Sequence, residues 1–375
     1  MIEVKNFVDA LVNAGTSIFT GVPCSYLIPL INEVIARKDT RYVVASSEGD
    51  AVSIASGCWL AGKTAVVLSQ NSGLGNMVNP LTSLVEPSRI PVLLLVTWRG
   101  RPGTTDEPQH KQMGEITPNL FGLLRLKWAH LPKDESQAIS AVRSALEYIG
   151  REEKPYALLI PGESFTETAR KTVPSLAHET DEHVRLPTRA EILKVFIEHV
   201  EEDAIVIATT GKTGRELFTL ADRPEHFYCV GSMGYASSVA HGVALASDRK
   251  VYVVDGDGAA IMHLGNLTSI GASARANLTH IVLDNEAYDS TGAQPTASKT
   301  TDFAMAAKAA GYAQSGTYVG CDEFIANLRT SSLHGPRLLH VPISVGSMLK
   351  LGRPTIGPDK VARRLREHLA ERALS

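Results

Sequence analysis

Two apolar runs of β-type residues, each ending in a polar cluster, constrain the fold of this chain more than any other feature. The first run is Val251–Val254, followed by Gly256-Asp257-Gly258, and the second is His280–Leu283, followed by Asp284-Asn285-Glu286. Between Gly258 and Asn285 lie 26 residues, which is enough for a crossover helix and a return strand. The pattern predicts a βαβ unit whose clusters lie at the carboxyl ends of neighbouring parallel strands, where α/β sheets bind ligands.

Short apolar runs alternate with amphipathic stretches along the rest of the 375 residues. This alternation predicts parallel sheets with helices on both faces, and the length suits two such domains. Residues 171–187 contain two prolines, many charges and no apolar period, so they predict a linker. The expected fold is therefore α/β, with two doubly wound parallel-sheet domains. The strands that we expect are Ser17–Gly21, Arg41–Ala45, Thr64–Leu68, Pro91–Val96, Tyr156–Ile160, Ala204–Ala208, Phe227–Val230, Val251–Val254, Thr279–Leu283 and Arg337–Val341.

Composition argues against several classes of function. A net charge of −3 provides no basic field for nucleic acid. No apolar run approaches the roughly 20 residues that span a bilayer, and the N-terminus has no basic region of the kind found in signal peptides. The four cysteines are widely spaced and form no CxxC motif. We therefore expect a cytoplasmic protein that has neither a nucleic-acid nor a membrane partner.

The two polar clusters carry candidate metal ligands. The carboxylate of Asp257 and the side-chain oxygen of Asn285 suit Mg²⁺, which neutralises a diphosphate and prefers oxygen ligands. Gly256 and Gly258 let the backbone approach a phosphate, and the N-terminus of the next helix attracts the anion. A single Gly-Asp-Gly cluster on its own is more typical of an ordinary turn. Two clusters, each directly after a strand, favour the binding site.

Two common nucleotide motifs are excluded by position. Gly211-Lys212-Thr213 resembles the end of a P-loop, but Val206 stands where the first glycine of that motif is required. A dinucleotide fingerprint beginning at Gly73 would need a third glycine at Val78, and one beginning at Gly256 would need it at Ile261. The diphosphate is therefore not expected to belong to a nucleotide held by either motif.

Gly-Asp-Gly followed at this spacing by asparagine resembles the metal–diphosphate motif of thiamine diphosphate enzymes. Most decarboxylases of this family have a central domain where this chain has only the linker, so the chain resembles the compact subgroup of phosphonopyruvate and sulfopyruvate decarboxylases. The resemblance covers nearly the whole chain. Other matching segments are Phe19–Ser25, Glu48–Ala51, Gln70–Asn76, Trp98–Gly100, Asp106–His110, Thr210–Thr213 and Leu351–Thr355.

The resemblance implies a pyrimidine-binding domain at 1–175, a linker at 176–187 and a diphosphate-binding domain at 188–375. It also implies Mg²⁺ ligands at Asp257, Asn285 and the carbonyl of Ala287. Met233 would be an apolar wedge that bends the cofactor, although a methionine in such a glycine-rich turn is also a common core filler. The cofactor-binding residues that we expect are Thr210, Gly211, Gly231, Met233, Gly256, Asp257, Gly258, Ala259, Asn285 and Ala287.

Catalytic and substrate residues are implied in the same way. The family places a glutamate after the second strand to assist loss of the cofactor's C2 proton, and Glu48 has this position, although a helix dipole alone would also favour a glutamate there. His110, expected in a glycine- and proline-rich loop after the fourth strand, is the candidate for proton transfer. The expected contacts of the substrate's anionic group are Ser25, Arg99 and Lys299, with Arg101 and Lys111 as further cations.

The reaction implied by the resemblance is decarboxylation of 3-phosphonopyruvate to phosphonoacetaldehyde, a step in phosphonate biosynthesis. Decarboxylation of sulfopyruvate is the nearest alternative, followed by another 2-oxo acid decarboxylase or a carboligase. A non-catalytic homologue is disfavoured because the glutamate and the metal ligands are present. The family also implies a homodimer or larger homo-oligomer, in which the active sites lie where pyrimidine-binding and diphosphate-binding domains of different chains meet.

Overall fold

The computed structural model describes residues 1–166, 185–330 and 334–371. The chain divides into two compact units, Met1–Glu179 and Thr180–Ser375, which we call the N-terminal and C-terminal units. Most of the linker predicted at 176–187 lies outside the described residues, and Arg185–Pro187 have no regular secondary structure.

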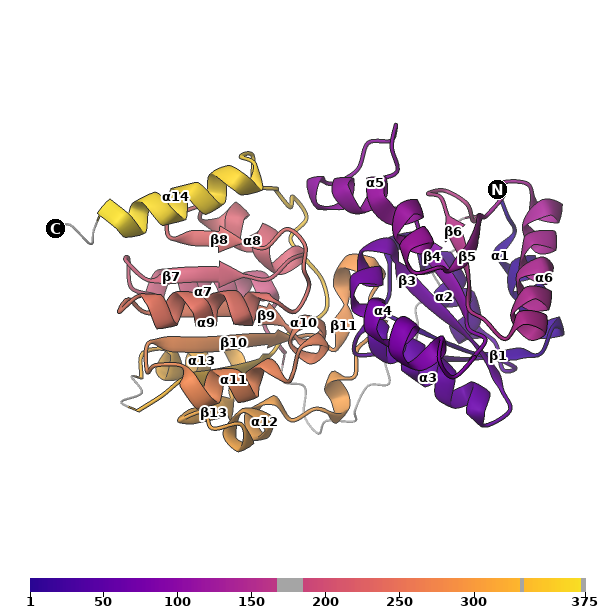
Figure 1. The fold of residues 1–375 in the computed structure, drawn as a ribbon. Helices are drawn as coiled ribbons and strands as arrows, with labels where there is room; N and C mark the ends of the chain where they lie inside the picture. The colour runs from indigo at the N-terminus through magenta and orange to yellow at the C-terminus, as the bar shows by residue number, and fades with distance from the viewer. Residues whose placement is uncertain (167–184, 331–333, 372–375) are drawn as a thin grey trace. The chain divides into compact units, whose positions relative to one another are not determined.

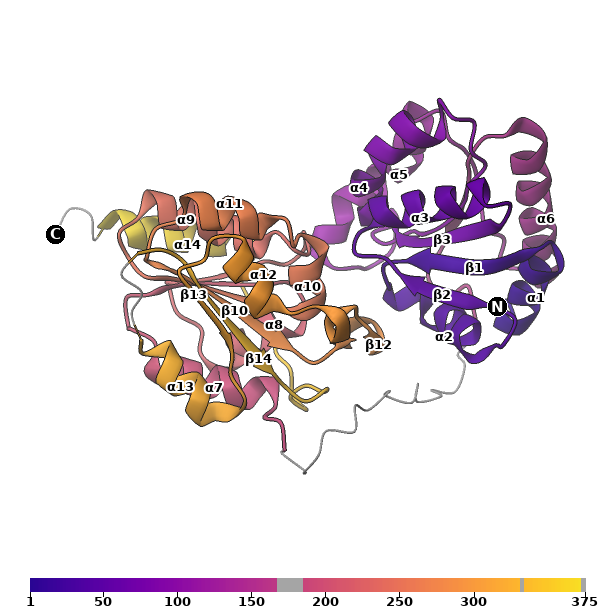
Figure 2. The ribbon, with the colours of Figure 1, turned by 90° about the horizontal axis from the view of Figure 1, so that it is seen from below.

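Residues 1–166 contain a six-stranded parallel sheet with strand order β2-β1-β3-β4-β6-β5 (Figures 1 and 2). The four inner strands are largely buried, since helices cover both faces. The order reverses between β1 and β3, which makes their carboxyl ends a switch point of the kind that binds ligands. The strands are β1 (Thr16–Gly21), β2 (Arg41–Val44), β3 (Thr64–Gln70), β4 (Leu93–Thr97), β5 (Lys127–His130) and β6 (Tyr156–Ile160).

Two apolar cores lie on the two faces of this sheet. One packs α1, α2 and α6 against the sheet, and the other packs α3, α4 and α5. The sheet therefore separates the two cores, as is expected of a doubly wound fold. The helices are α1 (Val4–Asn13), α2 (Ile28–Ala36), α3 (Glu48–Leu60), α4 (Leu74–Pro80), α5 (Pro108–Leu123) and α6 (Glu135–Glu152).

The C-terminal unit repeats this plan in residues 185–330 and 334–371, with a six-stranded parallel sheet of order β13-β14-β10-β9-β7-β8. A short antiparallel pair, β11 and β12, projects beyond the end of β10. The order reverses between β7 and β9, so this sheet also has a switch point. Its strands are β7 (Ile205–Ala208), β8 (His226–Tyr228), β9 (Val251–Gly256), β10 (Leu278–Asp284), β11 (Ala287–Tyr288), β12 (Gln294–Pro295), β13 (Gln314–Thr317) and β14 (Arg337–Pro342).

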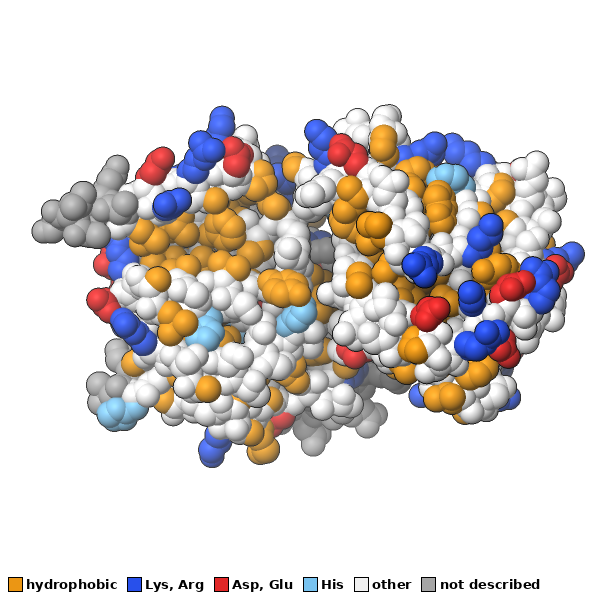
Figure 3. Space-filling model, in the orientation of Figure 1, with side chains coloured by type: hydrophobic (Ala, Val, Ile, Leu, Met, Phe, Trp, Pro, Cys, Tyr) orange, Lys and Arg blue, Asp and Glu red, His pale blue; other side chains and the backbone are white. Residues whose placement is uncertain are grey.

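Helices again cover both faces of the second sheet. One core includes α7, α8 and α13, and the other includes α9, α11 and α12, while α14 contributes to both. Hydrophobic side chains reach the surface between α9 and α14 (Figure 3), where Phe227, Val239 and Leu365 line an apolar groove. The helices are α7 (Arg189–His199), α8 (Lys212–Leu220), α9 (Ala236–Ala246), α10 (Asp257–Met262), α11 (Asn266–Ser273), α12 (Phe303–Ala309), α13 (Gly320–Leu328) and α14 (Pro358–Glu371).

The predicted fold class is confirmed, and the βαβ unit at 251–285 is formed by β9, α10, α11 and β10. One local expectation was wrong, because His110 lies in the first turns of α5 and not in a loop. Pro108 starts this helix at a position where a missing N–H costs nothing. None of the helices in the described part of the chain combines the length and apolarity that a bilayer span requires.

Candidate active site

The predicted site residues of the N-terminal unit follow its parallel strands at one edge of the sheet. Ser25 lies beyond β1, Glu48 begins α3 after β2, and Arg99 follows β4. Because the strands are parallel, their carboxyl ends share one edge. This edge includes the switch point, so it is the expected place for a ligand in this unit.

Glu48 is a buried carboxyl group at the N-terminus of a helix. Its side chain is only 7% exposed, and Oε2 accepts a hydrogen bond of 2.7 Å from Nδ2 of Asn76 in α4. Gly73 makes room for this carboxyl, since a Cβ there would lie 2.4 Å from the Glu48 side chain. Ser47 caps the helix by accepting a hydrogen bond from the N–H of Asp50. Glu48 is thus held in one place and is largely shielded from water.

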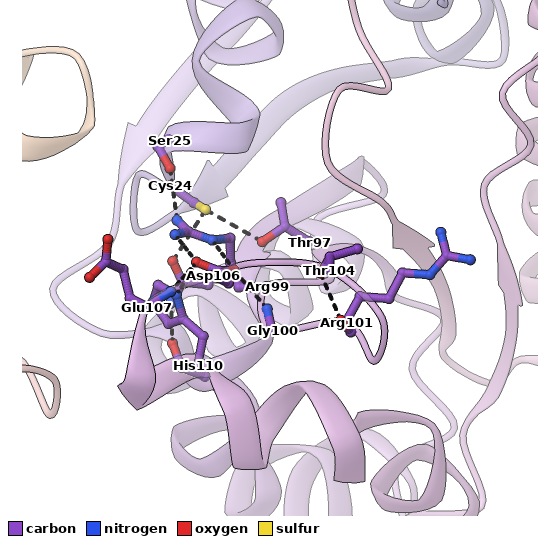
Figure 4. A network of polar contacts seen from close by, with 12 residues as sticks. Cys24, Ser25, Thr97, Arg99, Gly100, Arg101, Thr104, Asp106, Glu107 and His110 are labelled. Atoms are coloured by element: carbon purple, nitrogen blue, oxygen red, sulfur yellow. Dashed lines mark hydrogen bonds and ion pairs between the residues drawn. The ribbon is translucent and has the colours of Figure 1, made fainter.

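Ser25, Arg99 and His110 are brought together by a carboxylate that was not predicted as a site residue. Asp106 accepts hydrogen bonds from Nε and Nη2 of Arg99 at 2.8 and 2.6 Å, and it lies 2.9 Å from Nδ1 of His110 (Figure 4). Nη1 of Arg99 donates to Oγ of Ser25 at 3.0 Å. Burial lowers the pKa of His110, with Asp106 opposing the effect and Arg99 adding to it. The further predicted cation Arg101 stacks over Trp98, and Lys111 is exposed on α5.

In the C-terminal unit, Asp257 begins α10 directly after β9 and is 2% exposed. Its Oδ2 accepts a hydrogen bond from the hydroxyl of Thr296. Burial raises the pKa of Asp257 to about 7, and the nearby charge of Asp284 adds to the effect. Among the described residues no cation offsets this carboxylate in an ion pair. An uncompensated buried carboxylate is costly, and a bound divalent cation would remove that cost.

Asn285 follows β10, the strand that pairs with β9. Its Oδ1 accepts a hydrogen bond of 3.2 Å from the N–H of Ala287, whereas its buried Nδ2 has no hydrogen-bond partner in the described residues. Buried polar atoms are normally satisfied, so this N–H donor is free to bind a phosphate oxygen or a water molecule. The second lone pair of Oδ1 remains for a cation. Ala287, the third predicted ligand, lies in β11, two residues beyond Asn285.

Asp284 supports this loop and is itself compensated. His340 Nε2 lies 2.9 Å from its Oδ2, and the hydroxyl of Ser298 donates to the same carboxyl group. Burial acts to raise the pKa of Asp284, but the hydrogen bonds from His340 and Ser298 outweigh it and lower the pKa. Asp284 therefore stays ionised beside Asp257. The protein's own side chains thus compensate the charge of Asp284 more fully than that of Asp257.

The other predicted cofactor residues lie near the ends of neighbouring strands of the same sheet. Thr210 and Gly211 follow β7 and precede α8, and the buried hydroxyl of neighbouring Thr209 has no partner in the described residues. Gly231 and Met233 are half-buried in the turn between β8 and α9. Gly258 and Ala259 are in the first turn of α10 and are buried, and Gly256 ends β9.

Lys299, the remaining predicted substrate contact, lies in a 3₁₀ turn after β12. Its Nζ is 3.4 Å from Oε2 of Glu286, whose side chain is half exposed. Glu286 neighbours Asn285, so Lys299 belongs to the same loop system as the predicted metal ligands. It is thus placed in the C-terminal unit, whereas Ser25 and Arg99 are in the N-terminal unit.

Several contributing residues were not predicted. Asn76 and Asp106 lie within segments that carried the family resemblance. A search of those segments for polar partners of Glu48 and Arg99 could have found them. Thr296, Ser298 and His340 gave no such signal. They are separated in sequence from the carboxylates that they contact by 14 to 56 positions, and only the sheet topology brings them there.

Comparison with known proteins agrees with this geometry. Residues 4–119 match the N-terminal TPP binding domain of thiamine pyrophosphate enzymes, and residues 209–341 match the C-terminal TPP binding domain. Phosphonopyruvate decarboxylase from Streptomyces hygroscopicus is 44% identical over 99% of this chain and 95% of that protein, and the enzyme of the same name from Streptomyces viridochromogenes is 44% identical over 98% and 94%.

A more distant relative carries the alternative activity. Sulfopyruvate decarboxylase from Methanosarcina acetivorans is 26% identical over 97% of both chains. Each half of the chain contains one of the matched domains, and Glu48 and Asp257 lie within them. The chain therefore belongs to the thiamine pyrophosphate enzymes and is a thiamine diphosphate-dependent decarboxylase of the group that contains the phosphonopyruvate decarboxylases.

Proposed function

We propose that this chain decarboxylates 3-phosphonopyruvate to phosphonoacetaldehyde and CO₂, using thiamine diphosphate and Mg²⁺. The observation that carries the proposal is the 44% identity, over nearly the full length, to two enzymes named phosphonopyruvate decarboxylase. The lower identity to a sulfopyruvate decarboxylase supports the phosphonate over the sulfonate. Such a reaction would place the enzyme in phosphonate biosynthesis.

The residues of the C-terminal unit fit a Mg²⁺-bound diphosphate. Within the described part of the chain, buried Asp257 has no cation in an ion pair and the buried Nδ2 of Asn285 has no hydrogen-bond partner, so this Nδ2 suits a phosphate oxygen. We propose that Asp257, Asn285 and the carbonyl of Ala287 hold the metal. The N-terminus of α8, which begins after Gly211, would face the same anion.

The residues of the N-terminal unit would handle protons and the substrate. When bound, thiamine diphosphate supplies the nucleophilic carbon and the electron sink for the departing CO₂. We propose that Glu48, fixed by Asn76, provides the carboxyl group that promotes loss of the C2 proton. Ser25 and Arg99 would hydrogen-bond the anionic head of the substrate, and His110 would transfer a proton.

We propose that the enzyme is a homo-oligomer, as its family implies, with each active site completed by two chains. Glu48 would come from the N-terminal unit of one chain and Asp257 from the C-terminal unit of another. We also place the enzyme in the cytoplasm, a proposal supported by its cysteines, all four of which are free.

The substrate assignment is tested by comparing turnover of phosphonopyruvate, sulfopyruvate and pyruvate. We expect kcat/KM for phosphonopyruvate to exceed each of the others by at least roughly tenfold, because only the phosphonate offers a dianion with three acceptor oxygens. CO₂ release and aldehyde formation measure the rates. Faster turnover of sulfopyruvate would contradict the proposal.

Glu48→Gln tests the activating carboxyl group. The glutamine retains an oxygen that accepts from Asn76, so we expect thiamine diphosphate binding to persist while kcat falls roughly 10²- to 10⁴-fold. Calorimetry measures binding, and CO₂ release measures kcat. The matched control is Glu86→Gln, which removes the same charge from an exposed position of this unit and should leave both unchanged. Full activity of Glu48→Gln would refute the role.

Asp257→Asn tests the metal site through pH. Burial raises the pKa of this carboxyl above its unfolded value, so without metal its ionisation opposes folding and stability falls as pH rises from about 4 through about 7. We expect the metal-free variant to be more stable than the wild type at pH 8 by a few kcal/mol, with no difference at pH values below about 4.

Thermal unfolding with and without Mg²⁺ and thiamine diphosphate completes this test. The wild type should gain stability from the ligands, whereas Asp257→Asn should not. Asp203→Asn, an exposed carboxylate of the same unit, is the control and should behave as the wild type. Ligand-dependent stabilisation of Asp257→Asn would show that the metal is held elsewhere.

Mixing two inactive variants tests whether chains share sites. Oligomers are assembled randomly from equal amounts of Glu48→Gln and Asp257→Asn chains. A site built from two chains is intact when the Asp257→Asn chain supplies Glu48 and the Glu48→Gln chain supplies Asp257. We expect recovery of about one quarter of wild-type activity after unfolding and refolding the mixture. Each variant refolded alone is the control. No recovery in mixed oligomers would show that each site is built from one chain.

A further inference from the structure

Asp106 binds two residues with different expected roles. Its side chain is 7% exposed and accepts from Arg99 twice, and it also contacts Nδ1 of His110. Figure 4 shows the three side chains converging beside the loop that follows β4. One carboxylate therefore connects a predicted substrate contact with the predicted proton-transfer residue.

Backbone groups complete the environment of this carboxylate. The N–H of Gly100 donates to Oδ2 at 2.7 Å, and that of Glu107 donates to Oδ1 at 2.8 Å. Burial acts to raise the pKa of Asp106, but the hydrogen bonds from Arg99 and His110 outweigh it and hold the pKa far below its ordinary value. A carboxylate has about four acceptor sites, and these contacts occupy them. Asp106 is therefore ionised and has little capacity left to contact a substrate.

The ionised carboxylate determines where His110 carries its proton. An ionised carboxylate can only accept, so the short contact requires a proton on Nδ1. In the neutral imidazole, Nε2 then bears the lone pair. The charged groups that act on the ring are Arg99, Asp106 and Glu107, and burial together with Arg99 favours the neutral form.

The same carboxylate fixes the orientation of Arg99. Nε and Nη2 are bound to Asp106, Nη1 donates to Ser25, and the guanidinium lies 4.6 Å from the ring centre of Tyr26. Because Oγ of Ser25 accepts from Arg99, its own O–H remains to donate. The second N–H of Nη1 has no hydrogen-bond partner among the residues that the structure describes. Both donors are held in place before any anion arrives, which reduces the entropy that binding must lose.

The backbone is built for this close arrangement. Gly100 has a φ of +68°, and a Cβ there would lie 2.0 Å from the carbonyl oxygen of His110. A Cβ at Gly114, one turn further along α5, would lie 1.7 Å from the carbonyl oxygen of Gly100. Helix α5 can therefore dock directly against the loop that carries Arg99, and this contact sets the position of His110.

We propose that Asp106 is a positioning residue that holds Arg99 and His110 as one preorganised unit, with the proton of His110 on Nδ1 and Nε2 available for proton exchange. The roles of Arg99 and His110 in turnover rest on the proposed function. The tautomer does not, because it follows from contacts within the N-terminal unit. Orienting carboxylates of this kind are worth large factors in rate although they touch no reacting atom.

The tautomer is measured by ¹⁵N NMR of the histidine side chains in the holoenzyme, with the His110 signal identified by its loss in His110→Gln. We expect a neutral ring protonated at Nδ1 in the wild type. In Asp106→Asn the amide can donate to Nδ1, so we expect protonation to move toward Nε2, together with a fall in kcat of roughly 10²-fold or more. Glu115→Gln, an exposed carboxylate on the same helix, should change neither.

A conservative variant separates positioning from folding. Asp106→Glu keeps the charge, so it should retain the Nδ1-protonated ring and recover part of the lost kcat, even if Asp106→Asn folds poorly. A wild-type ring protonated at Nε2 would overturn the proposal, as would an unchanged tautomer in a folded Asp106→Asn. Because the NMR measurement needs no turnover, failure with phosphonopyruvate would count against the substrate assignment alone.

Discussion

Burial of carboxylates at the carboxyl edges of two parallel sheets is the constraint on which the site depends. A carboxylate removed from water is costly unless hydrogen bonds or cations satisfy it. Each buried carboxylate here is satisfied to a different degree. Arg99 and two backbone N–H groups compensate the charge of Asp106. His340 and Ser298 bind Asp284, whereas Asp257 accepts from the hydroxyl of Thr296 and has no ion pair within the described residues. The degree of compensation therefore distinguishes Asp257, the proposed metal ligand, from the carboxylates whose charge protein groups compensate.

This difference explains how neighbouring carboxylates can have opposite electrostatic behaviour. Asp284 ends β10 and Asp257 follows the paired strand β9, yet the pKa of Asp284 is lowered and that of Asp257 is raised. His340 and Ser298 reach Asp284 from other segments of the unit, so its charge is fixed. That fixed charge then acts on Asp257, together with burial. A divalent cation between such groups would gain attraction from both, which is the physical reason to place the metal here.

The inner strands of both sheets could be predicted from the sequence, whereas two edge strands could not. Inner strands such as β4 and β7 are almost entirely apolar, because helices bury both of their faces. The edge strands β5 (Lys127–His130) and β13 (Gln314–Thr317) are half exposed and have no such run. Helix α5 was also missed, since its buried stripe is His110, Gly114, Thr117 and Phe121, and only the last of these is a large apolar residue. Local pattern cannot reveal partners such as Asn76, whose contact with Glu48 depends on packing between helices.

The pairing of Arg99 with Asp106 changes what that arginine can contribute to substrate recognition. Its charge is already balanced by a carboxylate that is itself buried, so Arg99 adds little net positive potential for an incoming dianion. In the proposed role, Arg99 would contribute an N–H donor of fixed orientation beside the hydroxyl of Ser25. Phosphonate and sulfonate differ by one charge and share a tetrahedral shape. If Arg99 and Ser25 bind the substrate as proposed, discrimination between the two would rest on the number and strength of the hydrogen bonds that the anion accepts, which favours the more basic oxygens of the phosphonate.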